Sequence, residues 1–448
     1  MAVAQSGTEK VGPQPEARSR GQRSVGYVAI ITVAGAFVAF ALISRKIDGS
    51  MLTGPMLFAG LGLLVGPAAL GLVPLQVSND ALRILAEITL VLVLFSDAAH
   101  IDLRQLRRDH NLPVRALILG MPLSIALGFA AAVMIFADIT LWEAALLAAI
   151  LVPTDAALGQ AVVSNPRVPV RIRQALNVES GLNDGIALPV ILIFAALASA
   201  SNQSDDAIQW ITFGVQEVTL GPLAGVVTGY LGAKFVALCS RKLWMNEQAE
   251  GIIALGLAFG AFGLAEAIHG SGLIAAFVAG LTFGNTMRLR CAFLYAFAET
   301  EGQILVMLTF LAFGSAMLPT ALATVTPMHL LYALLALTLV RMLPVSLSLL
   351  GTGIKPVTSL FLGWFGPRGL ASVLFVLLIV EGAELAHGDT IFTAVIITVA
   401  MSIVLHGVSA GPVARWYGAR TDEMGTCEEN QLVAEEPFVD APARDATA

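Results

Sequence analysis

Long apolar runs separated by short polar stretches extend along the chain from residue 26 to residue 411. A helix needs about 20 mostly apolar residues to cross a bilayer, and most of these runs reach that length. In lipid, each backbone polar group must find a partner inside the protein, so the runs predict helices. We predict about thirteen transmembrane helices, at approximately 26–44, 51–73, 81–98, 114–136, 139–163, 174–199, 210–238, 248–267, 270–286, 299–318, 327–350, 357–380 and 390–411. The pattern therefore predicts an all-α polytopic membrane protein.

Composition supports one membrane domain with two polar ends. Of the 448 residues, 57% are hydrophobic and 13% are charged, whereas soluble domains carry roughly 25% charged residues. Residues 1–25 are predicted to form a disordered arm, without the cleavage site of a signal peptide. Residues 412–448 are predicted to be a disordered acidic tail, because eight acids accompany one arginine after Arg420. Much of the net charge of −7 lies in this tail and does not indicate a nucleic-acid partner. The membrane domain is predicted at 26–411.

The distribution of Lys and Arg predicts the orientation. Most of them lie in loops on the side reached after the first segment, whereas the other side has Arg83 and the four basic residues of the N-terminal arm. Under the positive-inside rule, the first of these sides is cytoplasmic, so the C-terminus lies inside and the N-terminus outside a plasma or bacterial inner membrane. Cys239, Cys291 and Cys427 then fall at cytoplasmic ends or in the tail, and no disulfide is predicted.

An internal repeat is visible at a shift of 218 residues. The stretch "TGPMLFAGLGLLVGP" (53–67) then lies over "SGLIAAFVAGLTFGN" (271–285), so that Gly54, Gly62 and Gly66 coincide with Gly272, Gly280 and Gly284. The five segments of 51–199 pair with the five of 270–411, and the two sets begin on opposite sides of the membrane. Such inverted-topology repeats are typical of secondary transporters.

Two segments at equivalent places in the repeats contain a proline beside polar residues. They are "VPTDA" (152–156) and "WFGPRGLAS" (364–372). Proline lacks an N–H and interrupts a helix. Freed backbone groups at membrane depth are tolerated only where protein or a water-filled cavity surrounds them. The two predicted broken helices therefore indicate where a transported ion would bind.

Several charged residues fall inside these apolar segments. Inserting a charged side chain at the centre of a membrane helix costs about 2.5–3.5 kcal/mol on insertion scales. Arg368 needs a counter-ion, and Glu179 is predicted to supply it as a structural ion pair in the core. Asp155 is predicted either to contribute to an ion site or to cap a broken helix. Asp97 is predicted to be a helix cap or solvated. Arg341 lacks an evident partner and is treated as structural.

Asp184 lies near the middle of its segment and is the predicted cation and proton ligand. In a helix, Ser180 shares a face with Asp184, four residues apart. The Asp184 carboxylate, the hydroxyls of Ser180 and Thr154 and carbonyls of the broken helix would form an all-oxygen site, which suits a hard alkali cation. A proton and a cation would compete for the carboxylate. This competition produces exchange if the site must be neutralised before it can cross the membrane.

The stretches "PTDAALGQAVV" (153–163), "NVESGLNDG" (177–185) and "GWFGPRGLAS" (363–372) resemble the monovalent cation:proton antiporters, in particular the electroneutral sodium/proton branch. The resemblance covers most of 26–411. It implies a dimerisation domain and a mobile core in which two discontinuous helices cross, and hence a homodimer. Carried over by motif, the ion-binding carboxylate is Asp184, the residues that help to form the Na⁺ site are Thr154, Asp155 and Ser180, and Glu179 pairs with Arg368. The pair Asn183–Asp184 resembles the electroneutral type, whereas electrogenic relatives carry two aspartates there. Asn183 is therefore counted with Asp184 among the predicted residues of the cation and proton site.

We therefore expect electroneutral one-for-one exchange of Na⁺, and also Li⁺, for a proton by alternating access, without a cofactor or enzymatic activity and with a role in pH homeostasis. A potassium/proton antiporter is the first alternative. A cation channel would need a filter of carbonyls or a ring of acids, and no such motif is present. An intramembrane aspartyl protease would use Asp155 and Asp184, but its Tyr-Asp and Gly-x-Gly-Asp motifs are absent from the sequence.

Overall fold

The computed structural model describes residues 15–47, 51–73, 80–101, 103, 106, 111–163, 165–202, 207–242, 244–245, 249–287, 302–380, 385–423 and 429. All regular secondary structure within these residues is helical. Seven of the described helices are long and apolar enough to cross a membrane, and several shorter apolar helices accompany them. The predicted all-α membrane fold is confirmed.

Every one of the predicted segments contains a described helix. The first six segments correspond to α1 (Pro15–Ile47), α2 (Gly54–Val65), α3 (Asp80–Ala99), the continuous α5 (Asn111–Arg115), η1 (Ala116–Gly120) and α6 (Met121–Ile135), the interrupted α7 (Leu141–Ile150) and α8 (Ala156–Val163), and α9 (Val170–Asn202). The element η1 is a π-helical turn.

The remaining segments follow in the same order. They correspond to α10 (Ala207–Arg241), α11 (Ala249–Ala267), α12 (Gly272–Thr286), the continuous α14 (Gln303–Ala312), η3 (Phe313–Met317) and α15 (Leu318–Thr324), α16 (Pro327–Leu337) with α17 (Leu339–Ser348), the interrupted α18 (Pro356–Trp364) and α19 (Leu370–Phe375) with η4 (Val376–Val380), and α20 (Gly388–Glu423).

The two ends of the chain differ from the prediction. Helix α1 begins at Pro15, inside the arm predicted to be disordered. Helix α20 continues to Glu423, beyond the predicted end at residue 411. The cause is packing that hydropathy does not report, because the buried Tyr417 ring stacks on Phe361 of α18 at a centroid distance of 3.9 Å. The predicted disorder of 1–14 and of most of the tail after Glu423 lies outside the described residues.

One residue of the acidic tail is buried against the helical domain. The Oε1 atom of Glu429 accepts hydrogen bonds from the Lys355 amide at 2.7 Å and from the Thr358 hydroxyl at 2.9 Å. These donors lie at the start of α18, where amide groups lack helical acceptors and a negative charge is stabilising. The prediction of a wholly disordered tail is therefore wrong at Glu429.

The glycines of the repeat make reciprocal close contacts. A Cβ atom on Gly62 of α2 would collide with the backbone of Leu311 in α14. A Cβ atom on Gly280 of α12 would collide with the backbone of Phe95 in α3. The first helix of each predicted repeat thus packs against the second helix of the other, with glycine where the backbones meet. The repeat boundaries at 51–199 and 270–411 stay predictions.

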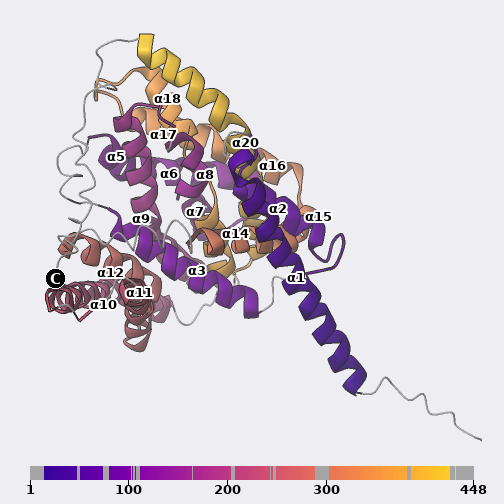
Figure 1. The fold of residues 1–448 in the computed structure, drawn as a ribbon. Coiled ribbons are helices and arrows are strands. Elements are labelled where there is room, and N and C mark those ends of the chain that lie inside the picture. Colours follow the sequence, from indigo (N-terminus) through magenta and orange to yellow (C-terminus); the bar gives the residue numbers. More distant parts are fainter. Residues whose placement is uncertain are drawn as a thin grey trace, which may run out of the picture.

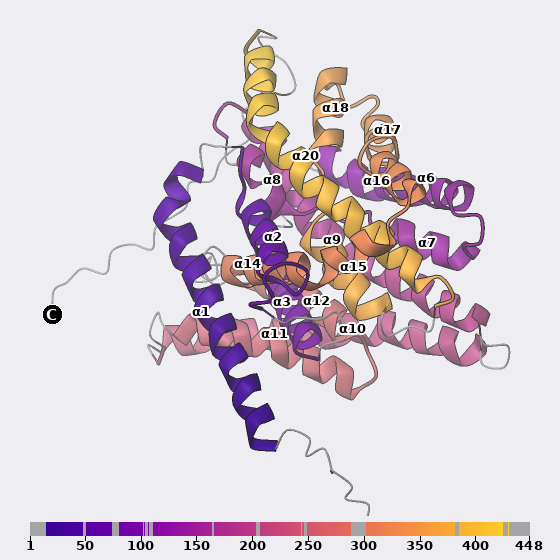
Figure 2. The same ribbon diagram turned by 90° about the vertical axis from the view of Figure 1, so that its right-hand side faces the viewer.

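Five helices at one side of the molecule pack together and include α9, which carries Ser180, Asn183 and Asp184. Helices α10, α11 and α12 pack beside one another, and α3 and α9 lie against them. Figure 1 shows this group at the lower side, with α17, α18 and the C-terminal part of α20 at the upper side. Helix α1 runs along the outer edge in Figure 2, where Phe37 and Phe40 contact Phe58 of α2.

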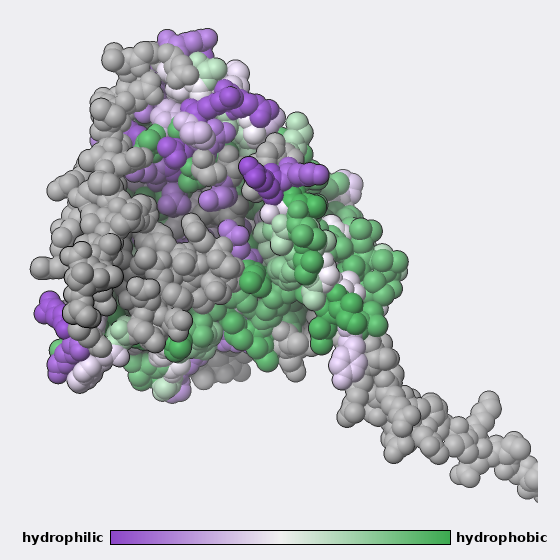
Figure 3. All heavy atoms as spheres, viewed as in Figure 1, coloured by the Kyte–Doolittle hydropathy of each residue, from purple (hydrophilic) through white to green (hydrophobic). Residues whose placement is uncertain are grey.

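Large apolar side chains remain exposed on the outside of the molecule. The most exposed include Ile31, Leu42, Met134 and Ile252, each more than two-thirds accessible. Figure 3 shows hydrophobic residues spread over the side near α1, while hydrophilic residues gather at the upper end, around α18 and α20. An apolar exterior of this kind is expected of a surface that faces lipid.

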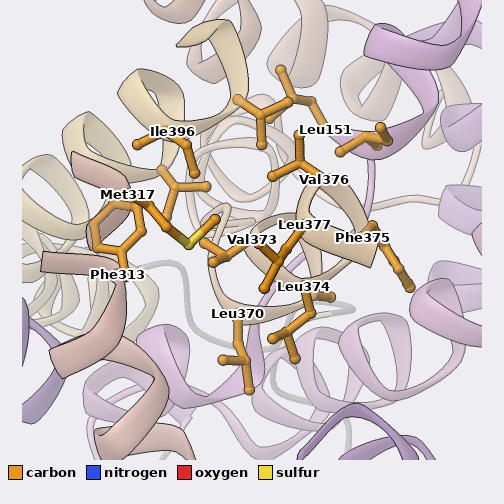
Figure 4. Packing of buried hydrophobic residues seen from close by; sticks show 14 of the residues in the cluster. Leu151, Phe313, Met317, Leu370, Val373, Leu374, Phe375, Val376, Leu377 and Ile396 are labelled. Carbon is orange, nitrogen blue, oxygen red and sulfur yellow. The ribbon is translucent and has the colours of Figure 1, made fainter. Parts of the chain in front are cut away.

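The core that supports the second broken helix is apolar. Figure 4 shows side chains of α19 and η4 surrounded by residues of η3, α20 and the end of α7: Leu151, Phe313, Met317, Leu370, Val373, Leu374, Phe375, Val376, Leu377 and Ile396. Because close-packed interiors transmit displacements, a shift of α19 would displace the side chains of all of these elements.

Both predicted helix breaks are present, and they meet. Helix α7 ends at Ile150 and α8 begins at Ala156, while α18 ends at Trp364 and α19 begins at Leu370. The amide of Asp155 in the first break donates to the carbonyl of Pro367 in the second at 2.8 Å. The two discontinuous helices thus cross at their non-helical stretches, as predicted.

Candidate functional site

Asp155 caps both half-helices at the crossing. Its Oδ1 atom accepts from the Leu158 amide of α8 at 3.4 Å, and its Oδ2 atom accepts from the Leu370 amide of α19 at 2.7 Å. The first amides of a helix lack internal acceptors, and the helix dipole favours a negative charge there. Of the two roles predicted for Asp155, the structure shows the cap, and it extends that cap to a second helix.

Whereas Asp155 lies at the N-terminal ends of two half-helices, Arg368 lies at the C-terminal end of α7. Its Nη1 atom donates to the carbonyl of Val152 at 2.8 Å, and it lies 3.4 Å from the carbonyl of Gly366. Val152 follows the C-terminal end of α7, where carbonyls lack helical donors and a positive charge is stabilising. The buried guanidinium therefore satisfies the backbone of the break.

The structure pairs Glu179 with Arg341, which corrects the predicted pair of Glu179 and Arg368. Arg341 Nη2 lies 2.5 Å from Glu179 Oε1, and both side chains are buried. Arg368 acts on Glu179 only through longer-range electrostatics. Arg341 can approach because Gly366 has no side chain, and a Cβ atom there would lie 2.5 Å from Arg341 Nε. The buried Glu179 charge is therefore balanced from α17.

Three predicted site residues form one buried hydrogen-bond network. Thr154 Oγ1 lies 2.9 Å from Ser180 Oγ, and Asn183 Nδ2 donates to Thr154 Oγ1 at 2.6 Å. Ser180 and Asn183 belong to α9, whereas Thr154 belongs to the first break. The structure thus brings the hydroxyl groups of Thr154 and Ser180 together, as the prediction of an oxygen site requires.

Asp184 and Asn183 present buried oxygens without hydrogen-bond donors. Asp184 Oδ1 and Asn183 Oδ1 have no partner among the described residues, although both atoms are inaccessible. A buried polar atom without a partner costs about 1–3 kcal/mol and needs an explanation. Asp155 is satisfied by two amides and Glu179 by a guanidinium, so of these three carboxylates Asp184 is the one with a buried oxygen that lacks a donor among the described residues.

A third acid, Asp97 of α3, interacts electrostatically with Asp155 and Asp184. Asp97 lies inside the last turn of α3 and is half-buried, so the predicted role as a helix cap is wrong, while its predicted contact with solvent stays a prediction. In the described part of the chain, no three His, Cys, Asp or Glu side chains lie together as a metal cluster. The arrangement suits a weakly held alkali cation bound by hydroxyl, amide and carboxylate oxygens, rather than a resident transition metal.

Sequence reasoning missed Arg341 and Asp97 for one reason. Both were treated as structural: Asp97 because it lies near the end of segment 81–98, and Arg341, inside segment 327–350, because no partner was evident. The signal was the apolar context, "LALTLVRML" (335–343) and "LVLFSDAA" (92–99). A charge inside such a run needs a partner or a function. Cys239 is not disulfide-bonded, and Cys291 and Cys427 lie outside the described residues.

We expect Gly369→Ala to destabilise the crossing. A Cβ atom at Gly369 would collide with the Asp155 carboxylate that caps α19. Overpacking of this kind costs about 1–3 kcal/mol, which a thermal unfolding midpoint of the purified protein detects. The matched control is Gly159→Ala in α8, where an added Cβ meets nothing within 4 Å. An equal midpoint for Gly369→Ala and Gly159→Ala would show that the close contact with Asp155 is not rigid.

Comparison with known families now identifies the class of this fold and site. Residues 30–416 match the model of the family described as "Sodium/hydrogen exchanger, transmembrane". The match covers most of the chain, so the chain belongs to this family of monovalent cation:proton antiporters. The resemblance predicted from the three motifs is confirmed.

Individual relatives agree with this class. The chain is 26% identical over 386 residues to the K(+)/H(+) antiporter NhaP of Alkalimonas amylolytica, covering 85% of this chain and 64% of the relative. It is 28% identical over 345 residues to the Na(+)/H(+) antiporter NhaP of Pseudomonas aeruginosa, covering 72% and 78%. The chain spans only 64%, 31% and 27% of the length of three curated antiporters that it matches.

A solved structure shares the fold. The sodium proton antiporter MjNhaP1 of Methanocaldococcus jannaschii superimposes with a TM-score of 0.68 at 21% sequence identity, covering 88% of this chain and 98% of that chain. This likeness concerns the arrangement of helices. The roles of individual side chains follow from the contacts above.

Proposed function

We propose that this protein exchanges a monovalent cation, Na⁺ or Li⁺, for a proton across a membrane, and that Asp184 binds them alternately. The observation that carries the proposal is the pair of buried oxygens without donors, Asp184 Oδ1 and Asn183 Oδ1. Asn183 belongs to the network of Thr154 and Ser180, and Asp184 follows Asn183 in α9. A cation or a proton supplies the positive charge that these oxygens lack.

Competition for one carboxylate is sufficient for coupled exchange. An ionised Asp184 is costly to bury. The conformational change that moves the site from one side of the membrane to the other is therefore unfavourable while Asp184 binds neither ion. Binding of either a cation or a proton neutralises the carboxylate and lets the site change its exposure from one side to the other. Each crossing therefore carries one of the two ions, which is alternating access.

The same contacts favour an electroneutral one-for-one stoichiometry. Asn183 cannot titrate, Glu179 is neutralised by Arg341, and Asp155 holds two helix N-termini. Asp97 is the remaining acid within electrostatic range of Asp184. If Asp97 also released a proton in each cycle, two protons would move per cation and the cycle would carry charge.

The stoichiometry is tested in proteoliposomes loaded with Na⁺ at fixed ion and pH gradients. A membrane potential is imposed with a potassium ionophore, and the initial rate of proton movement is compared with and without it. We expect equal rates and no steady current on a supported membrane. A current that reverses at the potential calculated for two protons per cation would overturn the one-for-one cycle and indicate Asp97 as the second carrier.

Potassium/proton exchange is the second candidate, because one curated relative is named a K(+)/H(+) antiporter. The same proteoliposomes, given gradients of Li⁺, Na⁺ or K⁺ in turn, distinguish the two. We propose a preference for Na⁺ and Li⁺, and proton movement driven by K⁺ alone would assign the protein to the second class.

The setting of this activity is also part of the proposal. We infer a homodimer in the cell membrane, with the C-terminus in the cytoplasm and the N-terminus outside, from the distribution of Lys and Arg and from the family resemblance. No cofactor is needed, because the transported ions supply the charge that changes during the cycle. Control of cytoplasmic pH is the expected physiological role.

A further inference from the structure

The break between α18 and α19 leaves backbone groups at both ends that no helical partner satisfies. The carbonyl of Trp364 accepts a hydrogen bond from His406 Nε2 at 2.8 Å. The amide of Arg368 donates to Ser402 Oγ at 2.7 Å. Ser402 and His406 are four residues apart on α20, so they lie on one face of that helix. One helix face therefore holds both ends of the break.

The proton in the hydrogen bond between His406 and Trp364 can be assigned from the chemistry of the two groups. The Trp364 carbonyl can only accept, so His406 Nε2 carries a proton. The other ring nitrogen of His406 contacts Ser402. Nδ1 lies 3.2 Å from Ser402 Oγ and 3.0 Å from the Ser402 carbonyl. The Ser402 hydroxyl oxygen accepts the Arg368 amide, so His406 also contacts the residue that holds the other end of the break.

The α18 end of the break is held by further contacts with α20. The rings of Trp364 and His406 stack with centroids 4.9 Å apart and an interplanar angle of 28°. Trp364 Nε1 donates to Ser409 Oγ at 3.0 Å. Ser402 and His406 are almost completely buried. Because solvent cannot replace these hydrogen bonds, their loss frees the break to move.

The position of this break determines the geometry of the other one. Pro367 accepts from the Asp155 amide, Leu370 donates to the Asp155 carboxylate, and Arg368 binds the Val152 carbonyl. Thr154, which anchors the network with Ser180 and Asn183, adjoins Asp155 in the chain. A displacement of the α18–α19 break therefore shifts the oxygens of the candidate cation site.

We propose that Ser402 and His406 are positioning residues of the cation site, which keep the α18–α19 break in register with the α7–α8 break without touching the ion. This inference rests on the proposed cation/proton exchange. Groups that orient direct ligands typically contribute a factor of about 10–100 in metal affinity. The effect should thus lie in the apparent affinity for the cation rather than in the turnover rate.

Two substitutions of His406 separate positioning from space filling. His406→Gln keeps an N–H donor near the place of Nε2, whereas His406→Phe keeps a flat ring over Trp364 but neither donates nor accepts. We expect His406→Phe to raise the apparent KM for Na⁺ about 10-fold or more while the maximal rate is retained, and His406→Gln to stay close to wild type. A lower maximal rate with unchanged KM, or equal behaviour of both variants, would overturn the proposal.

Amide hydrogen exchange of the 364–370 segment tests, independently of transport, whether Ser402 and His406 hold the α18–α19 break; these two residues and their contacts with the break are called the brace. Ser402→Ala and His406→Phe should speed exchange in this segment, and Ser402→Ala keeps the test open should His406→Phe fail to fold. The control is Thr398→Val, because among the described residues the buried Thr398 hydroxyl bonds to the Ala394 carbonyl of its own helix and to no part of the break. Unchanged exchange in Ser402→Ala would overturn the brace. Wild-type protein without cation-driven proton movement would overturn the proposed function, while the exchange result would still decide whether α20 holds the break.

Discussion

Asp184→Asn is expected to abolish exchange in a protein that still folds and inserts. Asparagine has nearly the shape of aspartate, but it neither titrates nor carries the charge that attracts a cation. Asp155 cannot take over, because its oxygens accept from Leu158 and Leu370 at the starts of two half-helices. Proton movement driven by a Na⁺ gradient should therefore fall to the level of liposomes without protein.

The matched control is Asp138→Asn, in the exposed connection between α6 and α7. It makes the same chemical change outside the site and should leave the rate unchanged. Both variants should elute as the wild type does in size-exclusion chromatography and melt at a similar temperature. Robust Na⁺-dependent proton movement by folded Asp184→Asn would show that another group carries the ions, and Asp97 would be the first to examine.

The largest expected effect on stability concerns Glu179 and Arg341. Removal of one partner from a buried ion pair leaves the other charge uncompensated, which costs roughly 3–5 kcal/mol. Glu179→Leu and Arg341→Met should each lower the free energy of unfolding by about this amount. The double variant should be much milder than the sum of the two, because it leaves no unpaired charge at this place.

A second cycle with Arg368 tests the choice of partner. Arg368 donates to the Val152 carbonyl and reaches Glu179 only at longer range. Arg368→Met should be destabilising in itself, but its effect should be nearly additive with that of Glu179→Leu. Stronger coupling of Glu179 to Arg368 than to Arg341, measured by unfolding in detergent with graded denaturant, would contradict the contacts described here.

The sequence was sufficient to predict what depends on local properties of the chain. Hydropathy located the membrane helices because each one must be apolar along its own length. Pro153 and Pro367 located the breaks because a missing N–H interrupts a helix wherever it occurs. The glycines at 62 and 280 indicated related halves, and both lie where two backbones meet. The network of Thr154 with Ser180 followed from motif and spacing together.

The choice of ionic partners depends on tertiary geometry and could not be predicted in the same way. Arg341 and Arg368 lie in consecutive segments, and either could have reached Glu179 on charge alone. The outcome is decided at the crossing, where the Arg368 guanidinium turns to the Val152 carbonyl and Gly366 leaves room for Arg341. Whether Asp97 faces the site depends likewise on the packing of α3 against α9 and α12.

The extension of α20 was missed for a related reason. Residues 412–423 are mixed polar, so hydropathy ended the segment at residue 411. The stacking of Tyr417 on Phe361 joins α20 to α18, and the contacts of Glu429 with Lys355 and Thr358 lie at the same end of the molecule. These pairs are far apart in sequence and leave no periodic signal.

A cation and a proton should exclude each other at Asp184. Calorimetric titration of Na⁺ into the purified protein measures this exclusion, in buffers with different ionisation enthalpies and at a pH where the empty site is protonated. The dependence of the heat on the buffer gives the number of protons released per cation bound. We expect one proton per Na⁺ for the wild type, and neither binding nor release for Asp184→Asn. Binding of Na⁺ by the wild type without proton release would show that the two ions do not share Asp184.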